Sequence, residues 1–292
     1  MRLRPFIQCH VGLRLRQIKQ NVGMSTSTAE DSNTSQPRSL SSIARLYGPQ
    51  ALALLARSHV AVVGLGGVGS WAAEALARSG LGRLTLIDSD HVSQSNLNRQ
   101  VQAVQASLGR SKVDALSERL LSIGLPVQIN RVDAFLDEEN LNQLLGTAPD
   151  FWIDACDDRK AKRLLIEAFP ARQRPLKLVV CGAAGGKTDP TRICRDDLSN
   201  ASHDPLLARL RNELRRALAA KKRPSSRLNV QVVYSQEPTR RPIEPEGELP
   251  QAPSGLSPGG FLACAGYGSS VAVTASMGMA AAAYAMECLV KP

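Results

Sequence analysis

The chain reads Val-Ala-Val-Val-Gly-Leu-Gly-Gly-Val-Gly-Ser over residues 60–70, a β-branched run that enters a glycine-rich turn. Glycines let the backbone come close to a phosphate, and residues 68–79 predict a helix whose first N–H groups face that anion. Asp88 lies about 20 residues further on, at the end of the next apolar run, where a carboxylate can bind ribose hydroxyls. This part of the chain therefore predicts a nucleotide-binding βαβ unit.

Two cations after this unit distinguish it from a nicotinamide dinucleotide site. Arg99 lies in the segment Ser-Asn-Leu-Asn-Arg-Gln over residues 95–100, and Lys112 begins a predicted helix. A dinucleotide pyrophosphate is held mainly by backbone N–H groups and the helix dipole, whereas two cations beside a glycine loop suit a triphosphate. Lys112 lies at the helix end where the dipole disfavours a cation, so we expect a phosphate to be its partner.

Strand-like and helix-like runs alternate from residue 42 onwards. The predicted strands are 59–64, 83–88, 127–132, 151–155 and 177–182, and the predicted helices are 68–79, 112–123, 137–145 and 159–171. Repeated βαβ units predict an α/β fold with a Rossmann-like, doubly wound, mainly parallel sheet. Strands over 192–195 and 228–234 and a long amphipathic helix over 205–221 predict an additional C-terminal α+β part.

The first residues differ in composition from the rest. Residues 1–41 join a basic segment, 1–23, to a Ser/Thr-rich stretch, which predicts a disordered tail before a single domain over 42–292. The basic segment fits a targeting presequence, sequence upstream of a later start at Met24, or a genuine basic tail. Within the domain, residues 238–258 are rich in proline and lack periodicity, so we expect a loop there.

The last apolar run, 269–290, is long enough to raise the question of a membrane span. It consists mostly of small residues, and Glu287 lies inside it. We therefore expect no membrane span but a buried helix, whose small residues permit close packing, including packing across a dimer interface.

The chain carries 36 Lys and Arg residues against 26 Asp and Glu, a net charge of +10. This charge favours a polyanionic partner such as tRNA, although a basic surface without such a partner explains it equally well. Part of the excess lies in residues 209–227, which hold eight basic residues and one acidic residue. The six cysteines form no C-x-x-C pair, which argues against a zinc ribbon or a disulfide framework and suits a reducing cytoplasm.

The glycine loop, Asp88, the segment 95–100, Lys112 and the segment Ile-Asp-Ala-Cys-Asp-Asp over 153–158 occur together in this chain. The combination resembles the ubiquitin-activating-type adenylating enzymes, including their bacterial relatives in thiamine and molybdopterin synthesis. Further segments narrow the resemblance to the tRNA-modifying branch of these enzymes, the threonylcarbamoyladenosine dehydratases: they are 44–48, 69–78, 182–191, 232–237 and 266–270. The sulfur-carrier-activating branch usually carries two C-x-x-C pairs, which this chain lacks.

The resemblance implies an ATP site with magnesium. Its catalytic residues are expected to be Arg99, Lys112 and Asp157, and Asp157 is expected to hold Mg²⁺. The residues expected to contact ATP are Gly64, Gly66, Gly67, Gly69, Asp88, Ser95, Asn96, Asn98, Arg99, Lys112, Asp157 and Asp158. Asp158 has an alternative role as the N-cap of the next helix, with Lys162 as its exposed partner four residues on.

The resemblance also implies an activity and partners. We expect ATP-dependent adenylation of threonylcarbamoyladenosine in tRNA, followed by cyclisation with net loss of water. A homodimer is implied, in which Arg45 reaches the triphosphate of the neighbouring subunit, and a sulfur-relay protein is raised as a further partner. Three alternatives stay open: adenylation of the C-terminal glycine of a sulfur-carrier or ubiquitin-like protein, a non-catalytic nucleotide-binding scaffold, and a nicotinamide dehydrogenase.

Overall fold

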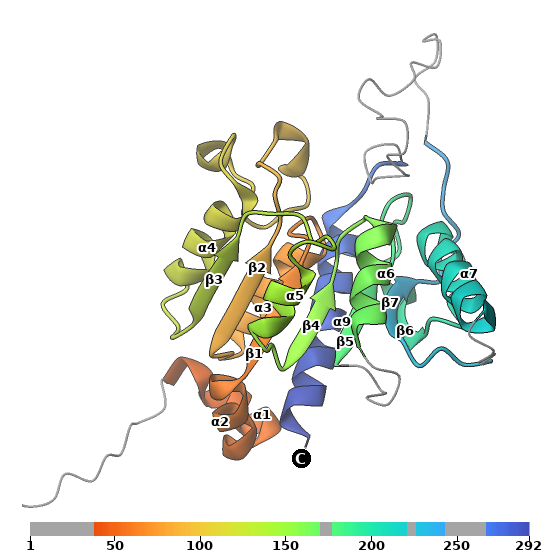
Figure 1. Ribbon diagram of the computed structural model, residues 1–292. Coiled ribbons are helices and arrows are strands. Elements are labelled where there is room, and N and C mark those ends of the chain that lie inside the picture. Colours follow the sequence, from red (N-terminus) through yellow and green to blue (C-terminus); the bar gives the residue numbers. More distant parts are fainter. Residues whose placement is uncertain (1–37, 170–176, 221–225, 243–266, 292) are drawn as a thin grey trace, which may run out of the picture. The chain divides into compact units, whose positions relative to one another are not determined.

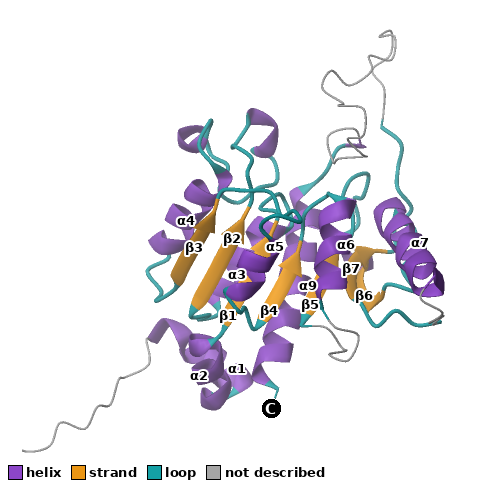
Figure 2. Ribbon diagram, in the orientation of Figure 1, coloured by secondary structure: helices purple, strands orange, loops and turns teal. Residues whose placement is uncertain are grey.

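The structure, a computed structural model, describes residues 38–169, 177–220, 226–242 and 267–291. Its helices are α1 (Ser41–Tyr47), α2 (Pro49–Arg57), α3 (Gly69–Arg78), α4 (Lys112–Ser122), α5 (Leu141–Gly146), α6 (Arg159–Ala168), α7 (Pro205–Ala220) and α9 (Val271–Val290) (Figure 2). Its strands are β1 (His59–Val63), β2 (Arg83–Ile87), β3 (Gln128–Val132), β4 (Phe151–Asp154), β5 (Leu178–Cys181), β6 (Ile193–Asp197) and β7 (Gln231–Ser235).

The described strands form one seven-stranded sheet in the order β3-β2-β1-β4-β5-β7-β6. Neighbouring strands run parallel from β3 through to β7, and the edge strand β6 is antiparallel to β7. The strand order reverses between β1 and β4, which is the switch point where open α/β sheets bind ligands (Figure 1). This topology confirms the predicted Rossmann-like, doubly wound, mainly parallel sheet with a C-terminal addition.

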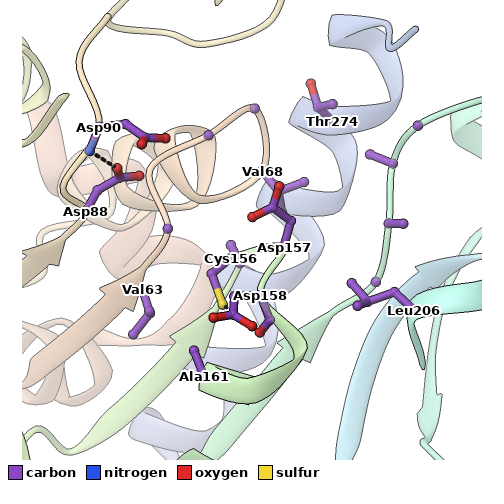
Figure 3. Close-up of a pocket in the computed structure, with 18 of the residues that line it drawn as sticks. Val63, Val68, Asp88, Asp90, Cys156, Asp157, Asp158, Ala161, Leu206 and Thr274 are labelled. Carbon is purple, nitrogen blue, oxygen red and sulfur yellow. Dashed lines mark hydrogen bonds between the residues drawn. The ribbon is translucent and has the colours of Figure 1, made fainter. Parts of the chain in front are cut away.

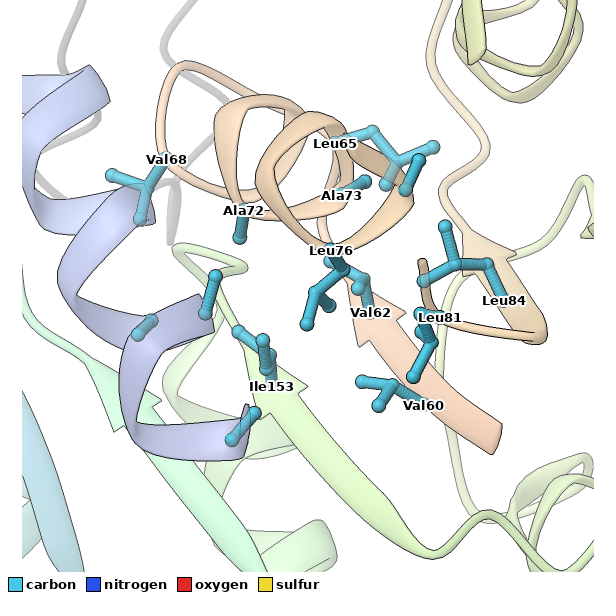
Figure 4. Packing of buried hydrophobic residues seen from close by; sticks show 14 of the residues in the cluster. Val60, Val62, Leu65, Val68, Ala72, Ala73, Leu76, Leu81, Leu84 and Ile153 are labelled. Carbon is cyan, nitrogen blue, oxygen red and sulfur yellow. The ribbon is translucent and has the colours of Figure 1, made fainter. Parts of the chain in front are cut away.

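Side chains alternate along β1 and enter two different hydrophobic cores. Val60 and Val62 pack with residues of α3, α4 and α9 on one face, whereas Ala61 and Val63 pack with residues of α5, α6 and α7 on the other. Figure 4 shows the first core, in which Leu76 of α3 lies next to Val62 of β1. Because helices cover both faces, the central strands β1, β4 and β5 are buried throughout, as their continuous apolar runs predict.

The C-terminal helix α9 lies in the first core. Val273, Met277 and Ala281 have no exposed surface, and Gly278 approaches α3 so closely that a β-carbon would lie 2.4 Å from the carbonyl oxygen of Val68. These contacts confirm a buried helix whose small residues permit close packing. By length and composition α9 would be able to cross a membrane. However, half of its most apolar stretch is buried inside the domain, as in a core helix.

Some boundaries differ from the predicted ones. The helix predicted over 137–145 begins at Leu141, because the Asp137 carboxylate accepts hydrogen bonds from two following backbone N–H groups at 3.0 Å and holds a turn. Helices α1 and α2 were not predicted from the sequence. Residues 38–40, assigned to the tail, form a 3₁₀ turn in which Leu40 is buried, and the preceding residues lie outside the described part. Most of the predicted loop 238–258 also lies outside it.

Candidate active site

A cavity of about 540 Å³ lies at the switch point, where β1, β2, β4 and β5 end. Figure 3 shows side chains from separate elements around it, with Asp88 after β2, Asp157 after β4, Leu206 on α7 and Thr274 on α9. The structure brings most of the predicted site residues into the lining: Gly64, Gly66, Gly67, Asp88, Ser95, Asn96, Arg99, Lys112, Asp157 and Asp158. Residues far apart in the sequence therefore meet at one site.

The glycine loop between β1 and α3 is shaped by close contacts between backbones. Gly64 has a positive φ of 82°, and a β-carbon on it would lie 2.6 Å from the backbone of Cys156. Gly69 lies outside the cavity lining. A β-carbon added to it would lie 1.9 Å from the carbonyl oxygen of Gly64. Gly66 lines the cavity and has open space where a β-carbon would be. Gly64 and Gly69 thus shape the turn, and Gly66 leaves room for a ligand beside the backbone.

Asp88 is held in the cavity by two backbone N–H groups. Its Oδ2 accepts a hydrogen bond from the Leu65 N–H at 2.6 Å. Its Oδ1 accepts one from the Asp90 N–H at 2.8 Å, which is the dashed line in Figure 3. Burial raises the pKa of this carboxyl, while the charge of Lys112 and the two hydrogen bonds oppose that shift. Because each carboxylate oxygen has a second lone pair, Asp88 retains acceptor capacity for a ribose.

Lys112, the first residue of α4, has carboxylate partners. Its Nζ lies 2.7 Å from Asp90 Oδ2 and 3.8 Å from Asp88 Oδ1, and its backbone N–H donates to the Asp90 carbonyl at 2.9 Å. An antiparallel bridge between His91 and Ser111 brings the two segments together. The expectation that a phosphate would supply the partner of Lys112 overlooked Asp90, because this contact depends on the bridge and not on local spacing.

Arg99 reaches the cavity from the segment after β2. Its Nη1 donates to the Ser95 carbonyl at 2.6 Å and to Asn98 Oδ1 at 3.0 Å, and its own carbonyl accepts a hydrogen bond from Trp71 Nε1 at 2.9 Å. Asn98 lies outside the cavity lining, and its Nδ2 donates to the Ser269 carbonyl at 2.9 Å. Asn98 thus ties this segment to the residues before α9, while Arg99 retains guanidinium N–H groups for a ligand.

The turn between β4 and α6 carries two aspartates with different surroundings. Asp158 caps α6, because its carboxylate accepts a hydrogen bond from the Lys160 N–H at 2.7 Å, which confirms the capping alternative. Asp157 is an exposed carboxylate in the cavity lining. Among the described residues, no group of three or more His, Cys, Asp or Glu side chains is placed to hold a metal. Magnesium at Asp157 would therefore take most of its ligands from phosphates and water, as Mg²⁺ commonly does in nucleotide sites.

A buried ion pair lies beneath this turn. Lys162 of α6 has no exposed surface, and its Nζ lies 3.0 Å from Oδ1 of Asp154 at the end of β4. The prediction of an exposed Lys162 paired with Asp158 is therefore wrong, because α6 turns this side chain toward the sheet. Burial is the largest influence on the pKa of Lys162 and lowers it, but the charge and hydrogen bond of Asp154, together with neighbouring Cys156 and Cys181, outweigh burial and leave the pKa raised. The Cys156 thiol donates to the same Asp154 oxygen at 3.0 Å, and burial raises the pKa of that thiol.

The C-terminal part of the chain forms a further wall of the cavity. Asp204, buried just before α7, accepts hydrogen bonds from Ala183 N–H at 2.8 Å and from Leu207 N–H at 3.0 Å, which joins α7 to the loop after β5. Several other lining residues were not assigned to the site from the sequence: Asp90, Gln100, Phe135, Cys156, Arg159, Arg209, Thr239 and Thr274. Most lie on loops or helices that meet only in the folded chain, and no local spacing marks them.

Arg45 lies away from the cavity of its own chain. It is exposed on α1, which precedes the amino end of β1, whereas the cavity lies at the carboxyl ends of the strands (Figure 1). Its Nη2 donates to Ser42 Oγ at 3.3 Å. A contact between Arg45 and a nucleotide therefore requires a second copy of the chain.

Glu237 fastens the loop that follows β5. Its Oε2 accepts hydrogen bonds from the backbone N–H groups of Thr188 and Asp189, each at 2.8 Å. Its Oε1 accepts one from the hydroxyl of Thr188 at 3.0 Å. These backbone hydrogen bonds lower the pKa of Glu237 to about 2. A carboxylate with a lowered folded-state pKa stabilises the fold above its unfolded pKa of about 4.3, and this contribution is lost as the pH falls toward the folded pKa.

We therefore predict that Glu237→Gln lowers the free energy of unfolding by a constant amount near neutral pH. The difference from wild type should shrink below a pH of about 4.3, because the wild-type carboxylate loses its advantage as it is protonated. Urea unfolding of both proteins across this pH range measures the difference. A difference that does not change with pH would mean that the charge of Glu237 does not hold the loop.

Comparison with known proteins places this geometry in a family. The model of the ThiF family matches residues 39–291. The chain belongs to the ThiF family. Among its relatives there, the tRNA threonylcarbamoyladenosine dehydratase of Haemophilus influenzae is 39% identical over 250 residues, which are 85% of this chain and 92% of the relative. The crystal structure of the Escherichia coli tRNA N6-threonylcarbamoyladenosine dehydratase in complex with ATP is 36% identical, with a TM-score of 0.73, and the match covers 86% of this chain and 93% of that chain.

Other relatives match a smaller part of this ThiF-family chain. The molybdopterin-synthase adenylyltransferase of Escherichia coli is 39% identical over 127 residues, which are 44% of this chain and 49% of the relative. The similarity to the two dehydratases thus extends over the C-terminal part as well as the nucleotide-binding half. It confirms the resemblance to the tRNA-modifying branch found in the sequence.

Proposed function

We propose that the chain is an ATP-dependent tRNA threonylcarbamoyladenosine dehydratase, which adenylates threonylcarbamoyladenosine in tRNA and cyclises it. The observation that carries this proposal is the cavity at the switch point. It unites the glycine loop, two cations and Asp157 in a chain that matches dehydratases over nearly their full length.

The reaction needs positioning and charge neutralisation rather than a protein nucleophile. The threonyl carboxylate attacks the α-phosphorus of ATP, the bond to the β-phosphate oxygen breaks, and pyrophosphate leaves. The acyl-adenylate is then attacked from within the same modified nucleoside, the ring closes, and AMP leaves. One carboxylate oxygen departs with AMP, so the nucleoside loses the elements of water.

Each proposed role follows from where a residue lies in the cavity. Arg99 and Lys112 neutralise phosphate charge, and Asp88 accepts hydrogen bonds from the ribose. The backbone at Gly66 gives the phosphates room to approach. Lys112 divides its charge between Asp90 and the incoming phosphates, because the Asp90 carboxylate already lies 2.7 Å from its Nζ.

Asp157 is the residue that we propose to hold magnesium. Its exposed carboxylate in the lining fits an ion that keeps phosphate and water ligands, whereas Asp158 is engaged in capping α6. When bound there, magnesium supplies positive charge to the triphosphate.

We further propose that the chain acts as a homodimer in the cytoplasm. The position of Arg45 supports the dimer, because this arginine lies away from its own cavity and would reach a nucleotide only in a second copy. The cytoplasmic location follows from the tRNA substrate and from six cysteines without a C-x-x-C pair. A sulfur-relay protein stays a proposed further partner.

The purified protein is expected to convert ATP into AMP and pyrophosphate when tRNA carrying threonylcarbamoyladenosine is present. Mass spectrometry of the digested tRNA should show the nucleoside lighter by one water. Unmodified tRNA of the same sequence is the control and should support no turnover. AMP release with a sulfur-carrier protein, and none with the modified tRNA, would instead favour adenylation of a carrier protein. That is the alternative suggested by the molybdopterin-synthase adenylyltransferase, which matches a smaller part of the chain.

A further inference from the structure

Helix α7 begins at the cavity and leads away from it. Pro205, Leu206 and Arg209, all in its first two turns, line the cavity, and Figure 3 shows Leu206 at that wall. The helix continues to Ala220, which gives its 16 residues a length of about 24 Å. A surface that starts at the rim of the site therefore extends well beyond it.

Burial fixes which face of α7 is turned outward. Its buried side chains are Leu207, Leu210 and Leu214. Arg209 and Arg216 are seven residues apart and so lie on the same face, opposite the leucines. Arg215 lies about 100° further around the helix, and all three arginines are exposed. In the described part of the chain, Arg215 and Arg216 have no ion pair or side-chain hydrogen bond.

Little negative charge offsets this face. The acidic residue of α7 is Glu213, and its carboxylate lies 2.9 Å from the Nε of Arg159 in α6. Asp204, which precedes the helix, is buried and accepts backbone hydrogen bonds. The outer face of α7 therefore presents Arg215 and Arg216, whose charge is available to a polyanion.

We propose that the outer face of α7 binds backbone phosphates of the tRNA and directs the modified nucleotide toward the cavity. The proposal rests on the proposed function, which makes tRNA the polyanion that must reach this rim. Guanidinium groups suit phosphates because their planar N–H donors match two phosphate oxygens at once. Residues that continue this basic segment, Lys221 and Lys222, lie outside the described part of the chain.

The test is charge reversal on the outer face, in the double variant R215E/R216E. We expect tRNA binding to weaken at least about tenfold at low salt, and the plot of log affinity against log salt to become shallower by about 1.5 to 2, because two phosphate contacts are lost. The dissociation constant for ATP should not change, since neither residue lines the cavity. R215Q/R216Q should show a smaller loss in the same direction.

A matched control is the double variant R57E/R83E. Arg57 ends α2 and Arg83 begins β2, so both exposed arginines lie at the amino ends of the strands, opposite the cavity. The net charge changes by the same amount as in R215E/R216E, but the salt dependence of tRNA binding should stay that of wild type. An equally shallow salt dependence of tRNA binding in both variants would overturn the proposal, because the overall charge of the protein would then explain the change.

Turnover of the wild-type protein separates this proposal from the proposed function. If the wild type forms the cyclic nucleoside and R215E/R216E keeps the wild-type salt dependence, the tRNA surface lies elsewhere and the activity stands. If the salt dependence of tRNA binding is shallower in R215E/R216E but the wild type forms no cyclic nucleoside, α7 binds tRNA and the proposed activity is wrong. Urea unfolding of each variant confirms that its fold is intact before binding is compared.

Discussion

Lys112→Ala is expected to lower kcat/KM for adenylation by at least about 100-fold, the range found when one charge-stabilising group is removed from an active site. Two effects add. The variant loses a charged hydrogen bond to a phosphate, worth about 1.5–3 kcal/mol. It also leaves the carboxylates of Asp88 and Asp90 facing the triphosphate without the cation that lies 3.8 and 2.7 Å from them.

Arg110→Ala is the matched control for Lys112→Ala. Arg110 lies two residues earlier, carries the same charge, and pairs with Glu118 on the surface rather than with a cavity residue. It should turn over at close to the wild-type rate. Steady-state kinetics with ATP and modified tRNA, together with ATP binding in the absence of tRNA, measure both variants. A rate for Lys112→Ala within a few-fold of wild type would show that Lys112 serves Asp88 and Asp90 and not the phosphates.

Lys162→Met is expected to lower the free energy of unfolding by about 3–5 kcal/mol, because it leaves a buried carboxylate without its cation. Asp154 has no exposed surface, and its Oδ2 already lacks a hydrogen-bond partner. The remaining charge would have only the Cys156 thiol and backbone near its Oδ1. Urea unfolding at neutral pH measures the loss.

Two further variants show whether this loss comes from the buried charge. Arg163→Met changes the neighbouring residue, whose Nε lies 3.0 Å from the Glu167 carboxylate in an exposed ion pair. This variant should lower the free energy of unfolding by no more than about 1 kcal/mol. The double variant Asp154→Leu/Lys162→Met removes both charges and should be more stable than Lys162→Met alone. The single variant Asp154→Leu completes the comparison. If the double variant loses as much free energy of unfolding as Asp154→Leu and Lys162→Met lose together, the side chains matter through packing and not through charge.

The fold was predictable because its determinants are local. Continuous apolar runs such as 60–63 and 151–153, separated by amphipathic helices, leave few alternatives to a parallel sheet covered on both faces. The site was predictable to the extent that its residues follow the ends of those strands, as Asp88 and Asp157 do. Strand ends in a parallel sheet meet at one edge, so sequence order alone brings these residues together.

The contacts that sequence reasoning missed depend on how separate segments meet. Asp90 reaches Lys112 through a bridge between two loops, and Arg209 and Thr274 enter the cavity on helices from the C-terminal part. Lys162 was placed on the wrong face because its spacing from Asp158 suits a surface pair. Lys162 also lies three and four residues before Leu165 and Ile166, which places it on the buried face of α6, and there its side chain reaches Asp154.

The position of α9 also bears on how the protein is made. The helix occupies the last residues of the chain, yet it packs against α3 at Gly278 and contributes Thr274 to the nucleotide cavity. During synthesis, the glycine loop and its helix leave the ribosome long before α9 does, and until then the part of α3 that packs against α9 stays uncovered. A nascent chain would therefore complete its binding site only after α9 has left the ribosome. Chains that lack α9 should therefore be recognised by chaperones and proteases as incompletely folded.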